Sequence, residues 1–195
     1  MLGFDKKSRN RGDTLIEVLF AVSVFSLVAV GSLSIMNQGT ATAERALEIT
    51  LVRQQIDAQA EALRYLNASY ILGSDTTEWP QIHTMAVANA KASDFTDAPC
   101  TVPPANTTFV LNTHTAKFVG DKQVLATTYS QVRYSGDNIT SVDGIWIQPV
   151  AAKSSADPNQ KNNGYIDFHI RACWDSPGQP LPVKIGTIVR LYEPR

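Results

Sequence analysis

The sequence predicts an α+β protein in which a long N-terminal helix packs on a C-terminal antiparallel β-sheet. Residues 14–72 contain no proline and form an apolar run followed by an amphipathic pattern of helical period. Beyond residue 74, prolines and turn residues separate short extended stretches. We therefore divide the chain of 195 residues into an N-terminal leader (1–12), a membrane-spanning helix (13–37), an amphipathic helix (38–73) and a β-rich head (74–195).

The charge of the chain is concentrated at its beginning. Four cations and one acid give residues 1–12 a net charge of +3, whereas the whole chain carries −1, so the remainder carries −4. A mildly acidic body does not indicate nucleic-acid binding, which needs a basic surface. The cations of the leader are Lys6, Lys7, Arg9 and Arg11.

The apolar run extends over 22 residues, from Leu15 to Met36, and Glu17 is its only charged residue. A helix needs about 20 predominantly apolar residues to cross a bilayer, and a single segment in lipid satisfies its backbone only as a helix. Since the basic residues precede the run, the positive-inside rule places residues 1–12 in the cytoplasm and the head outside. The chain is thus predicted to be a single-pass membrane protein.

The second helical pattern follows the apolar run without a proline. A helix over residues 14–72 would be roughly 88 Å long at 1.5 Å per residue. Gly31 and Gly39 are its weakest points, where we expect bending or loosening, and Gly73 is the expected C-cap. The apolar stripe comprises Ile49, Val52, Ile56, Ala60, Leu63 and Tyr70, and the opposite face carries Glu44, Glu48, Arg53, Gln54, Glu61 and Arg64.

Glu17 has two interpretations from its position alone. At the N-terminal end of the run it is an interfacial carboxylate favoured by the helix dipole. Alternatively it is a functional group, because charged residues in membrane helices are costly and usually paired.

The residues before the run favour the second interpretation. The stretch RGDTLIEV at 11–18, between a basic segment and the apolar run, resembles the prepilin signature of type IV pilins and type II secretion pseudopilins. The resemblance implies cleavage by a membrane peptidase between Gly12 and Asp13, frequent methylation of the new N-terminus, and a role of Glu17 in filament assembly. It also implies a helix-on-sheet fold. The implied partners are other pilin subunits, the prepilin peptidase, the inner-membrane assembly platform and, before assembly, membrane lipid.

One departure from the family pattern refines the prediction. Asp13 stands where the family usually has phenylalanine or another apolar residue, and its carboxylate can neutralise its own α-amine. Pairing of that amine with Glu17 of a neighbour is then weaker, which favours a low-copy minor subunit of a pilus or of a related secretion or DNA-uptake filament. The alternative is a permanently anchored surface domain for binding or adhesion. An ordinary secretory signal cleaved near 41–43 (ATA) is disfavoured, because 22 apolar residues exceed the usual 7–15 of such signals.

The head is predicted to contain a short helix and a sheet with one buried face. The helix falls within 79–92, at residues 82–90. Turn residues stand at 135–138 and 143–144. The expected strands cover 107–112, 117–119, 123–134, 139–151, 165–174 and 183–192, and in the fifth of them Ile166, Phe168, Ile170, Ala172 and Trp174 share the apolar face.

The two cysteines, Cys100 and Cys173, are 73 positions apart and match no metal-binding spacing. Two free buried thiols are one interpretation. If the head is exported, a disulfide between them is the other, because oxidising compartments preserve such bonds. Its closure would stabilise the head by about 4 kcal/mol in the loop-entropy description.

The sequence carries no recognisable catalytic motif, so we predict no enzymatic activity, no cofactor and no metal site. The three histidines lack metal-ligand spacing, and His169 is expected to be solvated. A flexible surface loop is favoured over a calcium loop at 154–164. Trp146 and Trp174 are expected in the core rather than at a partner surface.

Overall fold

The computed structural model describes residues 13–74, 77–89, 100–101, 106–120, 122–151 and 164–192, with the side chain of Asp13 outside that part. The chain separates into two compact units, Met1–Glu44 and Arg45–Arg195. Helix α1 (Asp13–Ile71) supplies all described residues of the first unit and the first element of the second. The predicted α+β architecture, a long apolar N-terminal helix followed by a helix face packed on an antiparallel sheet, is confirmed.

Helix α1 is 59 residues long and has no break in its secondary structure. Of the bending or loosening expected at Gly31 and Gly39, the loosening is therefore wrong, because a single glycine costs a helix only about 1 kcal/mol, and the bending stays a prediction. The predicted C-cap at Gly73 is confirmed by its positive φ of 72°. Its N–H donates to the Tyr70 carbonyl at 2.9 Å and the Ser74 N–H donates to the Ser69 carbonyl at 2.8 Å, the bond pair of a Schellman motif.

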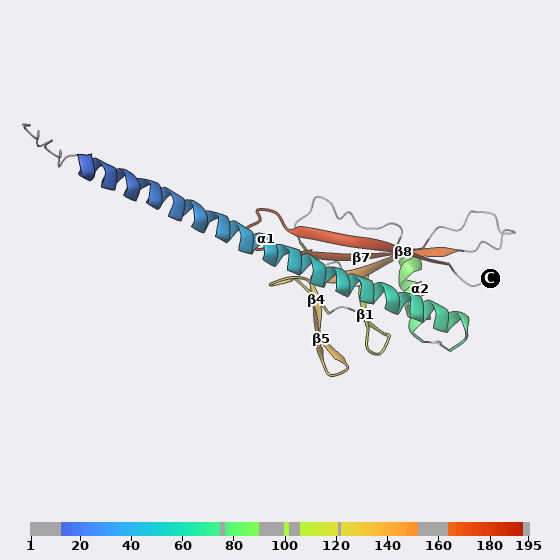
Figure 1. Cartoon of the computed structure of the whole chain (residues 1–195). Coiled ribbons are helices and arrows are strands. Elements are labelled where there is room, and N and C mark those ends of the chain that lie inside the picture. The colour runs from blue at the N-terminus through green and yellow to red at the C-terminus, as the bar shows by residue number, and fades with distance from the viewer. Residues whose placement is uncertain are drawn as a thin grey trace, which may run out of the picture. The chain divides into compact units, whose positions relative to one another are not determined.

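Two sheets make up most of the second unit (Figure 1). The larger has the strand order β2-β1-β6-β7-β8 with every neighbouring pair antiparallel. The smaller has the order β3-β5-β4, and its β3–β5 pair is parallel. The strands are β1 (Phe109–Asn112), β2 (Lys117–Gly120), β3 (Gln123–Val124), β4 (Gln131–Ser135), β5 (Asn138–Asp143), β6 (Ile145–Ala151), β7 (Tyr165–Trp174) and β8 (Val183–Tyr192).

Two of the predicted strands are wrong as single elements. The stretch 123–134 is divided into β3 and β4, and 139–151 is divided at Gly144, within the predicted turn. Gly144 has a φ of 60°, and a Cβ at this position would lie 2.3 Å from the Cys173 carbonyl oxygen. Only glycine adopts this conformation so close to another backbone. The chain therefore leaves one sheet at β5 and enters the other at β6.

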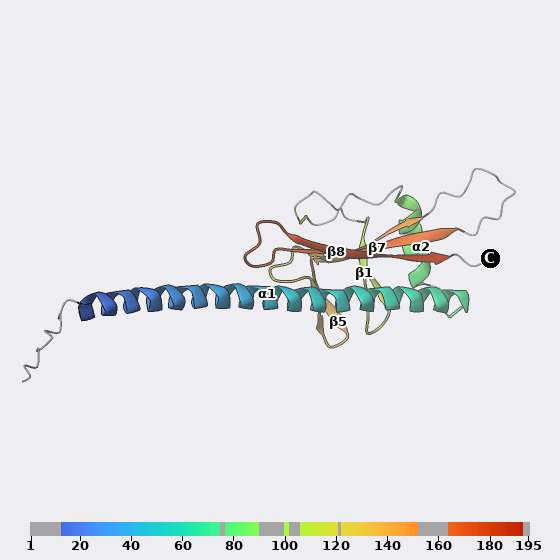
Figure 2. The same ribbon diagram turned by 45° about the horizontal axis from the view of Figure 1, so that its top comes forward.

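The amphipathic part of α1 covers one face of the larger sheet, which the view in Figure 2 shows edge-on. The predicted stripe is confirmed: Val52, Ile56, Ala60 and Leu63 are buried in one cluster with the apolar face of β7. The predicted face of β7 is buried throughout, Trp174 included, and Trp146 is also buried. Burial of this apolar area is the main term that stabilises the second unit.

Helix α2 (Glu78–Ala88) begins and ends before the predicted helix at 82–90. It closes one end of the core with Trp79, Ile82 and Ala86, all buried. The Trp79 ring packs against Tyr70 of α1 and Phe168 of β7, with centroids 6.1 and 5.8 Å apart. Helix α2 therefore joins the end of α1 to the middle of the sheet.

Candidate assembly segment and the head that follows it

The first unit presents an apolar surface from Leu15 to Met36. Every Leu, Ile, Val, Phe and Met between Leu15 and Met36 is exposed, from 43% for Val24 to 75% for Leu27. The segment is long and apolar enough to cross a membrane, and none of it is buried within the chain. A single-pass membrane protein accounts for such a surface, since exposed apolar area of this extent is unfavourable in water.

The serines of this segment are compatible with an apolar surrounding. Ser23, Ser26 and Ser32 each donate their hydroxyl proton to the carbonyl four residues earlier, at 2.8 Å. Such bonds satisfy the hydroxyls within the helix, so these three side chains do not need water. The helix can therefore be surrounded by lipid or by other helices along these positions.

Glu17 is the only charge between Leu15 and Met36, and its side chain is exposed like those of its apolar neighbours. Glu17 lies one helical turn after Asp13, the first residue of α1. The predicted cleavage residue Gly12 lies outside the described residues, as does the side chain of Asp13. The Glu17 carboxylate is therefore the one charged group on this otherwise apolar stretch of the described helix.

The head is held to α1 by a carboxylate that the sequence analysis assigned to the polar face. Glu48 is only half-buried, but its Oε2 accepts hydrogen bonds from Trp174 Nε1 at 3.0 Å and from Ser176 Oγ at 2.7 Å. Both donors belong to the end of β7 and the turn after it. Glu48 therefore fixes the last residue of β7 to the beginning of the part of α1 that packs on the sheet.

A second polar contact from α1 was missed by sequence reasoning. Gln59 is fully buried, and its amide donates to the Leu111 carbonyl and accepts from the Leu111 N–H, both at 2.8 Å. Strand β1 pairs with β6 only at Phe109. The Gln59 amide takes the place of a strand partner for Leu111. The signal was available, because position 59 lies in phase with Val52, Ile56 and Leu63 and is the only polar residue of that set.

Cys100 and Cys173 form a disulfide, with their Cα atoms 5.6 Å apart. The second of the two sequence interpretations is therefore confirmed. The bond ties the segment before β1 to the penultimate residue of β7, and the Cys173 side of it is buried. It joins positions 73 residues apart, so it restricts most of the head in the unfolded chain.

The outer face of β7 and β8, turned away from α1, is rich in cations. At one end Arg190 forms two hydrogen bonds with the Asp167 carboxylate, at 2.7 and 2.8 Å, and lies 3.9 Å over the ring centre of Tyr165. These bonds to Asp167 raise the pKa of Arg190. His169, expected to be solvated, is instead partly buried, and desolvation together with the nearby Arg171 lowers its pKa below 6.5. His169 is thus neutral at physiological pH.

Among the described residues, no three His, Cys, Asp or Glu side chains come together as a candidate metal site. The segment weighed as a calcium loop, 154–164, lies outside the described residues apart from its last position. The predicted absence of metal and cofactor therefore stays a prediction.

An exposed apolar helix followed by a disulfide-bonded α+β head is consistent with a single-pass membrane protein, and among the described residues α1 is the helix long and apolar enough to span a membrane. No family model matches the chain, and neither a curated protein nor a solved structure matches it. Any more particular assignment therefore rests on the residues themselves.

Proposed function

We propose that the chain is a structural subunit, of the minor kind, in a type IV pilus or a related secretion or DNA-uptake filament. It is made as a membrane precursor with a cytoplasmic N-terminus, cut after Gly12 and transferred from lipid into a bundle of sister helices. The observation that carries the proposal is the coincidence of Glu17 with an apolar helix surface that the chain itself leaves uncovered.

The exposed apolar surface can be surrounded first by lipid and later by the helices of other subunits. Lipid covers the side chains from Leu15 to Met36 in the precursor, and equally apolar helices of other subunits replace the lipid in a filament. The serine hydroxyls bonded within the helix demand no new partner in either environment. The exchange therefore costs little, and transfer between membrane and filament is physically reasonable.

In this proposal Glu17 determines how neighbouring subunits are positioned along the filament axis. A carboxylate costs about 2.5–3.5 kcal/mol at the membrane centre on insertion scales and less at the end of the run where Glu17 lies, and a partner cation offsets that cost. Cleavage after Gly12 removes four cations and creates an α-amine at Asp13. The α-amine of one subunit against Glu17 of the next fixes their axial offset, and the carboxylate of Asp13 competes for that amine. This competition is the reason to place the chain among minor subunits.

Processing is tested by the mass of the N-terminus. The full-length chain is expressed in cells with and without a prepilin peptidase, and the purified protein is analysed by mass spectrometry. Loss of residues 1–12 only when the peptidase is present is expected, and a Gly12→Val variant should retain them. An intact N-terminus in the presence of the peptidase would refute the proposal and favour a permanently anchored surface domain.

Assembly is tested with Glu17→Ala beside Glu44→Ala, a matched exposed glutamate on the same helix outside the apolar run. The first variant should be cut normally, remain in the membrane and be absent from sheared filaments. The second should enter filaments at the wild-type yield. Wild-type incorporation of Glu17→Ala would remove the proposed role of this carboxylate.

A further inference from the structure

Strand β8 forms one edge of the larger sheet. All ten of its residues pair with β7, and no other described strand pairs with it. Its middle is open to solvent: Gly186, Thr187 and Ile188 are exposed, the last at 59%. An exposed edge of this length is a template for another strand unless it is covered or blocked.

The register identifies which backbone groups of β8 face outward. The Cys173 N–H donates to the Gly144 carbonyl at 2.8 Å, away from β8. Backbone groups alternate between the two sides along an antiparallel strand, so the even-numbered residues of β7 bond to β8. Their partners in β8 are the odd-numbered residues, because Ile170 pairs with Thr187. The N–H and C=O groups of Gly186 and Ile188 therefore point to the outer edge.

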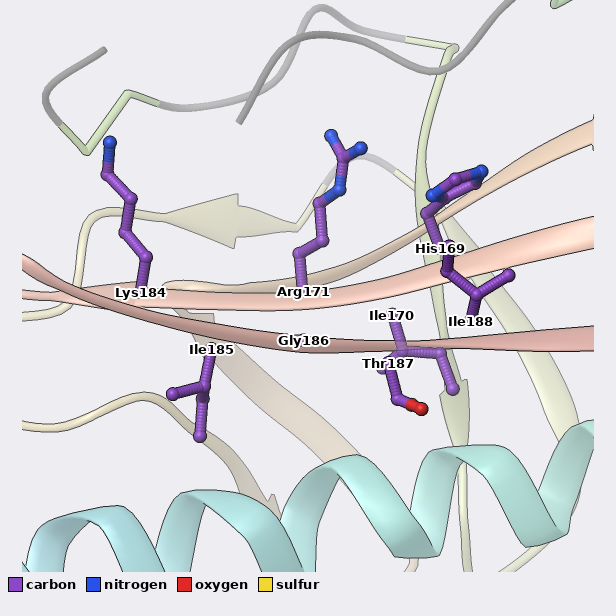
Figure 3. A pocket seen from close by; sticks show the side chains of 8 residues that line it. All are labelled: His169, Ile170, Arg171, Lys184, Ile185, Gly186, Thr187 and Ile188. Atoms are coloured by element: carbon purple, nitrogen blue, oxygen red, sulfur yellow. The ribbon is translucent and has the colours of Figure 1, made fainter. Parts of the chain in front are cut away.

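A groove of about 430 Å³ separates this edge from helix α1. Its apolar lining is Ile56 of α1 and Ile185 of β8, and its charged lining is Arg53 and Asp57 of α1; Lys184 borders it, but its side chain extends to the side away from α1 (Figure 3). A strand added to β8 would place alternate side chains into this groove. Those side chains would meet Ile56 and Ile185 beside the charged groups of Arg53 and Asp57, so the groove accepts an apolar side chain but does not select for one.

The opposite face of the same edge is cationic. Figure 3 shows Lys184, Arg171, His169 and Ile188 on the side away from α1, while Ile185 and Thr187 lie on the α1 side. A second hollow of about 430 Å³ lies along these residues. The remaining side chains of an added strand would lie beside Lys184 and Ile188, where acidic residues are favoured by charge.

We propose that the β8 edge binds an extended segment of a partner protein that carries acidic residues on the face turned away from α1, by strand addition at Gly186 and Ile188. The main-chain bonds supply affinity that does not depend on sequence, and the cationic face of the edge supplies selectivity. This inference does not depend on the proposed filament role, since it concerns the head alone.

A second copy of this chain is a poor occupant of the same edge. Strand β8 contains the cations Lys184 and Arg190 and no acid. Two copies of β8 paired with each other would therefore bring cations beside cations, which is unfavourable across a strand pair. An acidic strand from a different protein has no such penalty.

The test uses the full-length chain in detergent micelles and a fluorescein-labelled decapeptide of alternating glutamate and valine. Binding is followed by fluorescence anisotropy, and backbone protection by hydrogen exchange of the amides. The peptide should slow exchange at Gly186 and Ile188. Ile188→Pro, which removes an outward N–H that β7 does not use, should weaken binding about tenfold or more. Ile188→Thr, which keeps the N–H, should bind within about twofold of wild type.

Three further measurements make the outcome decisive. A peptide N-methylated at alternate residues should fail to bind the unchanged protein, so the conclusion survives if Ile188→Pro does not fold. A peptide of alternating lysine and valine should bind more weakly than the acidic one. The proposal is overturned if the acidic peptide does not bind, if exchange slows elsewhere, or if ultracentrifugation shows the protein already dimerised through this edge.

Discussion

Replacing Gln59 by leucine tests how the head satisfies the backbone of β1. Leucine has a similar volume, so the core is not emptied, but both hydrogen bonds to Leu111 are lost. The two backbone groups of Leu111 are buried and have no other strand partner on that side, since β1 meets β6 only at Phe109. An unsatisfied buried group costs about 1–3 kcal/mol, so the expected loss of stability for the two groups is about 2–6 kcal/mol.

The measurement is urea unfolding of the full-length chain in micelles, followed by the fluorescence of the buried tryptophans. Gln54→Leu, an exposed change five residues earlier on the same helix, is the control and should stay within about 0.5 kcal/mol of wild type. Hydrogen exchange gives a local readout, because the Leu111 amide should lose its protection before its neighbours in β1.

Two results would refute this reasoning about Gln59. A loss of less than about 1 kcal/mol would mean that leucine burial offsets both bonds. Continued protection of the Leu111 amide would mean that another group takes over the N–H. Either result would mean that apolar contacts, and not the hydrogen bonds to Gln59, stabilise β1.

Three shorter predictions concern the same head. Glu48→Ala removes an acceptor of two hydrogen bonds and should cost about 2–4 kcal/mol in urea unfolding, with Glu44→Ala as the neutral control. Reducing the Cys100–Cys173 bond should lower the free energy of unfolding by about 2–4 kcal/mol, and a loss below about 1 kcal/mol would contradict the loop-entropy argument. Because burial lowers the pKa of His169, the unfolded chain binds more protons below about pH 6.5, so stability should fall as the pH drops through that range and stay level above it. The His169→Gln variant should show a smaller fall between about pH 7 and about pH 5, and an unchanged profile would assign the effect to other groups.

The sequence was most informative where one chemical pattern continues without interruption. Strands β7 and β8 have the predicted bounds of 165–174 and 183–192, because the alternation of apolar and polar residues persists over ten positions. The stripe of α1 was predictable for the same reason. In both cases the pattern of burial is local and depends only on which face is covered.

The division of 123–134 could not be predicted from the sequence. The residues between β3 and β4 include threonines and a tyrosine, which favour strands. The chain turns there because Ser130 donates its hydroxyl proton to the carbonyls of Gly144 and Cys173, at 2.9 and 3.1 Å. These partners are 14 and 43 positions away, so no local propensity encodes them.

The candidate site residues also fall into those that a local sequence pattern indicates and those that depend on a partner far along the chain. Glu17 was singled out because a charge in an apolar run is conspicuous without any partner; it lies within an exposed apolar surface, and its role in assembly stays a prediction. Glu48 and Gln59 were not identified, because each acts through a partner far along the chain. A polar residue in phase with an apolar stripe was the one local sign, and it applied to Gln59 only.

The two halves of α1 differ in what covers their apolar side chains. Between residues 45 and 71 its apolar stripe is covered by the sheet, and its polar residues Glu48 and Gln59 have partners within the head. Between residues 15 and 36 every large apolar side chain is uncovered and the hydroxyls of Ser23, Ser26 and Ser32 are satisfied internally. The apolar side chains of residues 45–71 are covered within one molecule, whereas those of residues 15–36 need lipid or other helices to cover them. If the chain assembles into a filament as proposed, the segment whose apolar surface the chain itself does not cover is the place to test for it, and Glu17 is the residue to change there.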